Sequence, residues 1–264
     1  MKLPIYQVDA FADQPFEGNP AAVCPLECWL PDSVLQSIAE ENNLSETAFF
    51  IGAGDRYHLR WFTPIQEVDL CGHATLAAAH VLFSGECESA DQLSFDSRSG
   101  PLRVFRDGDL LTLDFPTDPG IRCESPVDLI EGLRATPVEC YRAMDYLAVF
   151  DSEAKIAEIS PDFQRLKALD RRGVIVTARG EEEDFVSRFF APKFGIDEDP
   201  VTGSAHCTLA PYWARTLGKN ALSAKQISKR TGLLKCRLSA DRVFISGRVA
   251  DYLQGQIEIP DVHF

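Results

Sequence analysis

Two short segments place a glycine and a polar residue where an apolar helix should begin. Gly72-His73 precedes the apolar run of residues 74–83, and Gly203-Ser204 opens a second helical stretch over residues 204–217. Free N–H groups and the positive end of the helix dipole make such positions suitable for anions. We therefore expect Gly72, Gly203 and Ser204 to face one cleft and bind the carboxylate of a small substrate. Two ordinary capped core helices are the alternative.

Three side chains near these segments are candidates for proton transfer: Glu46, His73 and Asp199. Glu46 directly precedes an apolar run, where partial burial would suit a carboxyl group to work as both base and acid. A histidine at a helix start stays neutral easily, because the helix dipole disfavours its charged form, so His73 could assist. The structural alternatives are a surface turn for Glu46, a helix-terminal histidine, and a loop cap for Asp199.

Cys71 offers a different chemistry. It precedes Gly72 at a helix start, where the pKa of a thiol should be lowered toward the thiolate. A racemase with two thiol bases would need a second cysteine at the matching place in the second segment, but Thr202 stands there. A dehydratase that depends on Cys71 alone stays open, as does a small buried side chain without chemistry.

Metal and nucleotide sites have no support in the sequence. The five histidines form no H-x-x-x-H pair, and Cys24 and Cys28 have no second cysteine pair to complete a zinc site. There is also no G-x-G-x-x-G or P-loop pattern. We expect a protein that works without a cofactor.

The composition limits the possible partners. The 264 residues carry a net charge of −14, and no run of lysines and arginines opposes it, so a nucleic-acid partner is not expected. The longest nearly apolar run, residues 74–83, is too short to cross a bilayer. The N-terminal residues show no signal-peptide pattern, and the eight cysteines suggest reduced thiols. These features favour a cytoplasmic protein with no membrane partner.

The chain contains an internal repeat. Arg60-Trp61-Phe62-Thr63-Pro64 is echoed 128 residues later by Arg188-Phe189-Phe190-Ala191-Pro192, and Gly72 is echoed 131 residues later by Gly203. Matching segments in the same order indicate a duplication. The sequence therefore predicts two similar lobes, residues 1–116 and 117–264, with a C-terminal strand that could pack back on the first lobe.

Each lobe should consist of strands around one helix. Residues 74–83 are apolar on nearly all sides, which predicts a helix buried all round, whereas Pro211 should kink its counterpart. An earlier amphipathic helix should be capped by Asp32 or Ser33 and should end at Asn42-Asn43. Glu46 would then lie in a short turn before a strand.

Six ordered motifs resemble the phenazine-biosynthesis PhzF-like family, in the diaminopimelate epimerase superfamily. The resemblance runs from about residue 5 to the C-terminus; Thr231, at a turn, stands where relatives often have glycine. The motifs are Asn19-Pro20-Ala21-Ala22-Val23, Ser45-Glu46-Thr47-Ala48-Phe49, Arg60-Trp61-Phe62-Thr63-Pro64, Glu67-Val68-Asp69-Leu70-Cys71-Gly72-His73-Ala74-Thr75, Asp199-Pro200-Val201-Thr202-Gly203-Ser204-Ala205-His206 and Gln226-Ile227-Ser228-Lys229-Arg230.

This resemblance implies an α+β fold of two pseudo-symmetric domains, each an open β-barrel around a central helix, with the active site between them. It also implies a homodimer and no cofactor. The phenazine enzyme of the family isomerises a dihydro-hydroxyanthranilate by moving one ring proton. By motif, Glu46 would take and return the proton, His73 and Asp199 would assist, and the backbones of Gly72, Gly203 and Ser204 would bind near the substrate carboxylate.

The favoured function is thus a cofactor-independent isomerase that moves a proton on a small carboxylate-bearing substrate. A relative of the fold that binds a metabolite or a protein partner without catalysis is the rival interpretation, and the Cys71-dependent dehydratase is a weaker third.

Overall fold

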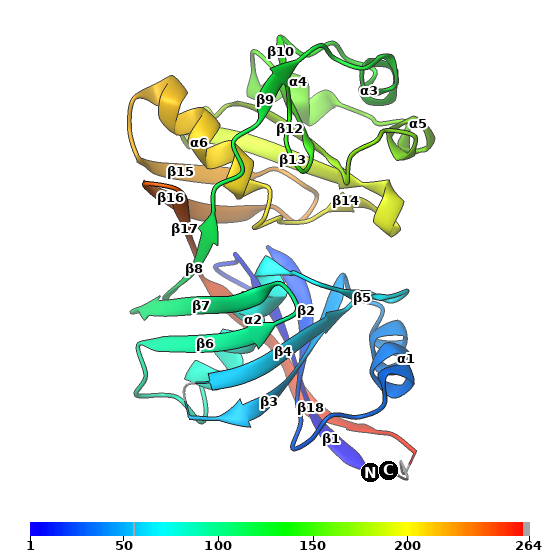
Figure 1. Ribbon diagram of the computed structural model, residues 1–264, viewed down its shortest axis with the longest axis vertical. Helices are drawn as coiled ribbons and strands as arrows, with labels where there is room; N and C mark the ends of the chain where they lie inside the picture. Colours follow the sequence, from blue (N-terminus) through cyan, green and yellow to red (C-terminus); the bar gives the residue numbers. More distant parts are fainter. Residues whose placement is uncertain (55, 261–264) are drawn as a thin grey trace. The chain divides into compact units, whose positions relative to one another are not determined.

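The computed structural model describes residues 1–54 and 56–260, which form two compact units. Unit 1 contains residues 1–114 and 246–260, and unit 2 contains Phe115–Ile245 (Figure 1). The first boundary lies two residues before the predicted one. The residues after Ile245 were assigned to the second lobe and belong to unit 1, through the C-terminal strand that was expected to be able to pack back on the first lobe.

Unit 1 is a curved sheet with two helices. Its strands lie in the order β18-β1-β2-β3-β4-β6-β7-β8, and β5 pairs with β4. The β2–β3 and β4–β6 pairs are parallel, and β18–β1, β1–β2, β3–β4, β6–β7 and β7–β8 are antiparallel. The elements are β1 (Lys2–Ala10), β2 (Asn19–Pro25), α1 (Asp32–Asn42), β3 (Glu46–Ala53), β4 (Arg56–Phe62), β5 (Glu67–Val68), α2 (Gly72–Phe83), β6 (Gln92–Ser97), β7 (Gly100–Asp107), β8 (Leu110–Pro116) and β18 (Val249–Glu258).

Unit 2 repeats this arrangement. The β9–β10, β10–β11, β12–β13 and β15–β16 pairs are antiparallel, and β11–β12 and β13–β15 are parallel. The elements are β9 (Ile121–Cys123), α3 (Val127–Leu133), β10 (Glu139–Arg142), β11 (Tyr146–Val149), α4 (Glu153–Glu158), α5 (Phe163–Lys167), β12 (Val174–Arg179), β13 (Phe185–Ala191), the 3-10 turn η1 (Pro192–Phe194), β14 (Ile196–Asp199), α6 (His206–Leu217), β15 (Ala221–Gln226), β16 (Gly232–Ser239) and β17 (Arg242–Gly247).

The repeat explains why the C-terminal strand returns to unit 1. In unit 2, β9 pairs antiparallel with β10, the first strand of the repeated series. In unit 1 the equivalent first strand is β1, and its outer neighbour is β18, paired from Lys2↔Glu258 to Ala10↔Val249. The C-terminal strand therefore fills in unit 1 the place that β9 fills in unit 2.

A matched ion pair also marks the repeat. In unit 1, Arg60 makes a bidentate pair with Glu67, at 2.7 and 2.8 Å, and in unit 2 Arg188 makes the same pair with Glu198, at 2.7 and 2.9 Å. Bidentate arginine–carboxylate pairs fix geometry as well as charge. Each pair ties the strand before the central helix to the short strand that follows it.

Helix α2 is the predicted buried helix. It begins at Gly72, and ten of its twelve residues are buried, because alanines let the surrounding strands approach closely. Its counterpart α6 starts at His206, two residues later than predicted, after a turn in which the His206 N–H donates to the Gly203 carbonyl at 3.0 Å. Helix α6 continues through Pro211. Because proline has no N–H to donate to the Cys207 carbonyl, four residues earlier, that carbonyl accepts a hydrogen bond from the Asp118 N–H at 2.9 Å instead.

Helix α1 shows one correct and one wrong prediction. It ends as predicted, with Asn43 in the left-handed region and its N–H donating to the Ala39 carbonyl at 3.1 Å. The predicted side-chain cap is wrong, because Pro31 holds the cap position and the Asp32 carboxylate instead accepts a hydrogen bond from Arg60. Glu46 lies at the first position of β3 rather than in a turn.

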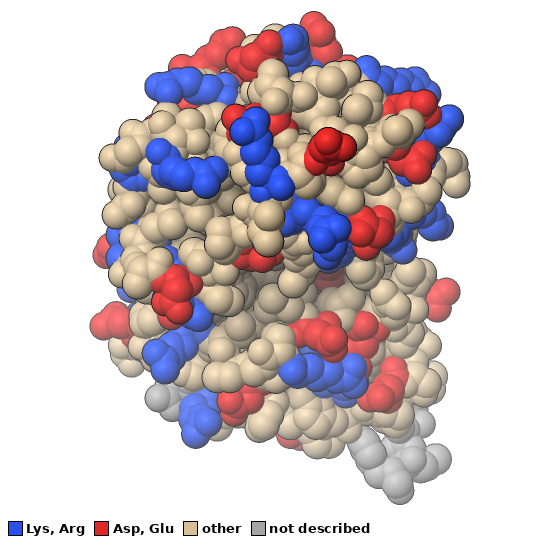
Figure 2. Space-filling model, turned by 45° about the horizontal axis from the view of Figure 1, so that its top comes forward, with Lys and Arg blue, Asp and Glu red and all other residues tan. Residues whose placement is uncertain are grey.

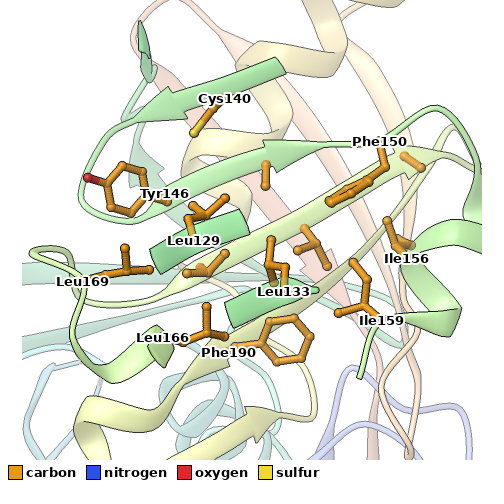
Figure 3. Packing of buried hydrophobic residues seen from close by; sticks show 14 of the residues in the cluster. Leu129, Leu133, Cys140, Tyr146, Phe150, Ile156, Ile159, Leu166, Leu169 and Phe190 are labelled. Carbon is orange, nitrogen blue, oxygen red and sulfur yellow. The ribbon is translucent and has the colours of Figure 1, made fainter. Parts of the chain in front are cut away.

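A second layer of helices covers the other face of each sheet. In unit 2, Leu129 and Leu133 of α3 pack with Ile156 of α4, Leu166 of α5 and Phe190 of β13 (Figure 3). In unit 1, α1 contributes the corresponding cluster. The central strands β2 and β3 of unit 1 and β11, β12 and β13 of unit 2 are thus buried on both sides, whereas β7, β16 and β18 keep exposed residues.

The surface agrees with the composition. On the face shown in Figure 2, lysine and arginine side chains are interspersed with aspartate and glutamate, and no continuous basic stripe crosses it. Among the described residues, none of the helices has the length and apolar character needed to span a membrane.

Candidate active site

In unit 1 the start of β3 lies beside the start of α2 and brings together two predicted residues. Glu46 is the first residue of β3 and His73 is the second residue of α2. His73 Nε2 lies 3.2 Å from Glu46 Oε2, with side chains only 5% and 12% exposed. Within the described structure neither atom makes a well-aligned hydrogen bond. Catalytic hydrogen bonds often tighten only when a ligand binds.

The other ring nitrogen of His73 faces two further groups. Asn19 Nδ2 lies 3.2 Å from Nδ1, and Cys71 Sγ lies 3.5 Å from the same atom. An amide N–H and a thiol S–H are both donors, so Nδ1 accepts in the neutral ring and the ring proton resides on Nε2. In the imidazolium both ring nitrogens carry a proton, so His73 presents an N–H to Glu46 in either state.

The pKa values in this cluster differ from two expectations. Burial raises the pKa of the Cys71 thiol to about 11, and the charge of Glu46 adds to that effect. The expectation of a lowered thiol pKa is therefore wrong: loss of hydration outweighs the helix start. For His73, burial opposes the charged ring, but Cys71 and Glu46 together raise its pKa well above the ordinary value. The expectation that the helix start keeps His73 neutral is therefore also wrong. Since the thiol is protonated near neutral pH, Glu46 is the charge that favours the imidazolium there.

Glu46, Cys71 and His73 are also a conceivable metal-binding set, since one atom of each lies within 4.8 Å of the others. The thiol, however, faces Nδ1 and the carboxylate faces Nε2. The two groups thus line opposite edges of the imidazole. This arrangement suits a chain of hydrogen bonds better than ligands converging on one ion.

In unit 2, Asp199 and Thr202 shape the loop before α6. The Thr202 hydroxyl donates to the Asp199 carboxylate, and Gln226, fully buried on β15, accepts the Thr202 N–H at 2.9 Å and donates to the Asp199 carbonyl at 2.8 Å. Thr202 is the repeat partner of Cys71. This network fixes the backbone that leads to Gly203 and Ser204.

Arg172 holds the side chain of Ser204. Its guanidinium makes a bidentate pair with Asp145, which is 2% exposed, and donates to Ser204 Oγ at 3.1 Å. The pKa of Arg172 is raised: burial opposes its charge, but Asp145 and, more weakly, Asp199 favour it. Sequence reasoning did not single out Arg172 as a functional residue.

Comparisons of the sequence and the structure with known proteins identify the family of this chain. The model of the phenazine biosynthesis-like (PhzC-PhzF) family matches residues 8–255. The chain belongs to the PhzF-like family. An uncharacterised isomerase of Pseudomonas aeruginosa is 56% identical to it, over 98% of this chain and all of its own. A crystal structure of a PhzF-family protein from Enterococcus faecalis has a TM-score of 0.95 at 49% identity, covering 98% of this chain and 100% of its own.

The PhzF-like fold extends to epimerases. A hydroxyproline epimerase from Agrobacterium vitis matches with a TM-score of 0.64 at 12% identity, over 98% of this chain and 93% of its own, a similarity of fold alone. The family and the α+β fold predicted from the sequence are thereby confirmed. The names of the curated relatives support an isomerase type of function.

The predicted site residues divide between the two units. Glu46, His73 and Gly72 meet in unit 1, whereas Asp199, Gly203 and Ser204 lie in unit 2. Joint action of the two helix starts on one ligand stays a prediction. Three contributing residues were not proposed from the sequence: Asn19, Gln226 and Arg172. The first two lie within the motifs that carry the family resemblance, so a signal for them was present.

Proposed function

We propose that this PhzF-like protein is a cofactor-independent isomerase that moves a proton on a small carboxylate-bearing substrate. The observation that carries the proposal is the pair of Glu46 and His73, whose facing atoms are buried and lie 3.2 Å apart. A carboxylate that is largely removed from water, with a histidine N–H beside it, is suited to accept a proton and to hold it.

In the proposed reaction Glu46 acts twice. Its carboxylate takes a proton from a substrate carbon as the C–H bond breaks, and the electron pair stays on the substrate. Glu46, now a carboxylic acid whose proton can exchange with water, returns a proton to another carbon, where a new C–H bond forms. His73 would orient the carboxyl group through Nε2–H, and Asn19 Nδ2 would hold the neutral ring through Nδ1. Asp199 is proposed to assist from unit 2.

One base on one side of the ligand suits a proton shift better than the inversion of a stereocentre, which needs two opposed bases. The strand register pairs Thr47 with Phe62 and Val174 with Phe190, so Gly173 occupies the place of Glu46 in unit 2. A Cβ at Gly173 would lie 2.7 Å from the Phe190 carbonyl oxygen, so this position has no room for a side chain.

The two rival interpretations have less support. A thiol-dependent dehydratase needs a thiolate, and the raised pKa of Cys71 keeps its proton in place near neutral pH. A purely binding role gives no reason for a glutamate with only 12% of its side chain exposed beside a histidine N–H. A homodimeric state and independence from cofactors stay predictions.

The test is hydrogen exchange at carbon. The protein is incubated in D2O with a panel of cyclic carboxylates and amino acids, and deuterium in each recovered compound is measured by mass spectrometry. Glu46→Gln should lower the exchange rate by roughly 10²-fold to 10⁴-fold. Glu40→Gln, at an exposed glutamate of α1, is the matched control. Exchange at the wild-type rate in Glu46→Gln would exclude Glu46 as the base.

A further inference from the structure

Arg172 is held more firmly than a surface arginine, yet part of its guanidinium has no partner in the described part of the chain. Nε and Nη2 bind the two carboxylate oxygens of Asp145, and Nη2 also donates to Ser204 Oγ. The guanidinium lies 5.4 Å from the ring centre of Phe189, and the side chain is 27% exposed. The N–H groups of Nη1 bind no acceptor among the residues that the structure describes.

The repeat gives this placement a meaning. Ser204 is the repeat partner of His73, and Arg172 directly precedes Gly173, the partner of Glu46. In both units, a charged residue at or just before the start of a strand thus contacts the residue that follows the motif glycine, which is His73 in unit 1 and Ser204 in unit 2. The charged residue is the acid Glu46 in unit 1, 3.2 Å from His73, and the cation Arg172 in unit 2, 3.1 Å from Ser204.

The contact also fixes what Ser204 can do. A hydroxyl has one hydrogen and two acceptor sites, and Ser204 Oγ uses one acceptor site for the Arg172 N–H. Its own hydrogen is therefore available to a ligand. The Arg172 and Ser204 side chains together offer N–H and O–H donors at one place, which matches an acceptor with several oxygens.

We propose that Arg172 recognises the carboxylate of the substrate, directly through Nη1 and indirectly by directing the Ser204 hydroxyl as a donor. This inference rests on the proposed function, because it names the group by which that substrate is recognised. Asp145 holds the guanidinium in place and removes its rotational freedom, so little entropy is lost on binding.

Comparing how tightly the protein binds a carboxylate and the matching primary amide shows whether Arg172 recognises the carboxylate or only supports the fold. The amide has nearly the same shape, but it carries no charge and brings N–H groups against the donors of Arg172 and Ser204. The probes are benzoate with benzamide and cyclohexanecarboxylate with its amide. Their dissociation constants are measured by NMR titration of the wild-type protein and of the variants.

The wild-type protein should bind each acid roughly tenfold or more tightly than its amide, which is about the effect of one charge-assisted contact. In Arg172→Gln this acid-to-amide ratio should fall close to one, and Arg172→Lys should keep part of it. Ser204→Ala should lower the ratio and leaves the Arg172–Asp145 pair intact, so it tests the proposal even if Arg172→Gln does not fold. Arg165→Gln, at an exposed arginine of α5 paired with Asp128, is the control.

An unchanged ratio in both Arg172→Gln and Ser204→Ala would overturn the inference. Equal binding of acid and amide by the wild-type protein, or no binding of either acid, would do the same. Glu46→Gln should keep the ratio. Loss of the ratio in Arg172→Gln without any Glu46-dependent exchange would therefore contradict the proposed function alone, and the reverse pattern would contradict only the role of Arg172.

Discussion

Replacing His206 with asparagine should remove a large part of the acid sensitivity of the fold. His206 is the first residue of α6 and is fully buried. Its Nδ1–H donates to the Thr202 carbonyl at 2.9 Å, whereas Nε2 has no partner among the described residues. Burial lowers the pKa of His206 from 6.5 to about 4. The folded protein therefore keeps this ring neutral where the unfolded chain protonates it.

The magnitude follows from that difference. Between pH 6.5 and about 4 the unfolded chain binds one more proton at this residue than the folded chain, so the free energy of unfolding falls as the pH falls. At 1.36 kcal/mol per pH unit, His206 accounts for about 3 kcal/mol of stability lost between pH 7.5 and pH 4. Asparagine does not titrate, and its amide can still donate to Thr202.

The assay is denaturant unfolding at pH 7.5 and pH 4. The decrease in the free energy of unfolding between these values should be smaller in His206→Asn than in the wild-type protein by about 3 kcal/mol. His58→Gln, at an exposed histidine of β4, is the control. Because only the difference between two pH values is compared, a constant packing cost of the substitution cancels. The same decrease in variant and wild type would show that His206 is not held neutral by burial.

Three further outcomes are expected. Cys71→Ser should keep the exchange rate within about tenfold, or about 1.4 kcal/mol of barrier, in the deuterium assay; a loss as large as that of Glu46→Gln would favour thiol chemistry. Because folding raises the pKa of His73, the charged ring stabilises the fold below about pH 6.5. This stabilisation is lost as the pH rises through the pKa of His73 in the folded protein. Glu46→Gln should thus be more destabilising at pH 6 than at pH 9 in urea titrations, and equal losses would contradict the pairing. Gly173→Ala should lower stability by roughly 1–3 kcal/mol in thermal melts, because its Cβ would meet a backbone carbonyl. Gly85→Ala, where a Cβ has ordinary contacts, should not.

The repeat and its central helices were predictable because both depend on local patterns. The aromatic strand segments and the glycine before each central helix recur at nearly constant offsets, and a run of alanines and leucines without a polar face indicates a helix buried all round. Asn43 ended α1 as predicted, since asparagine tolerates the left-handed backbone that this helix end needs.

Other features depend on contacts that no local pattern contains. The Asp32 carboxylate does not cap α1, because it accepts a hydrogen bond from Arg60, 28 residues away. The lowered thiol pKa expected for Cys71 was wrong because the loss of hydration on burial disfavours the thiolate more than the helix start favours it. The contact from Arg172 to Ser204 required the register of β12 against β13, which the sequence does not state.

The two units show which parts of a duplicated scaffold can differ. The pairs Arg60–Glu67 and Arg188–Glu198 have the same geometry in both units, because each holds a strand against the entrance of the central helix. The position at the start of the strand beside each helix start takes no part in these ion pairs. At this position the units differ, with Glu46 in unit 1 and Gly173 in unit 2. A Cβ clashes at Gly173, so a second carboxylate cannot arise there by a single substitution without moving the backbone of β13. The packing of unit 2 therefore restricts the proposed base to unit 1.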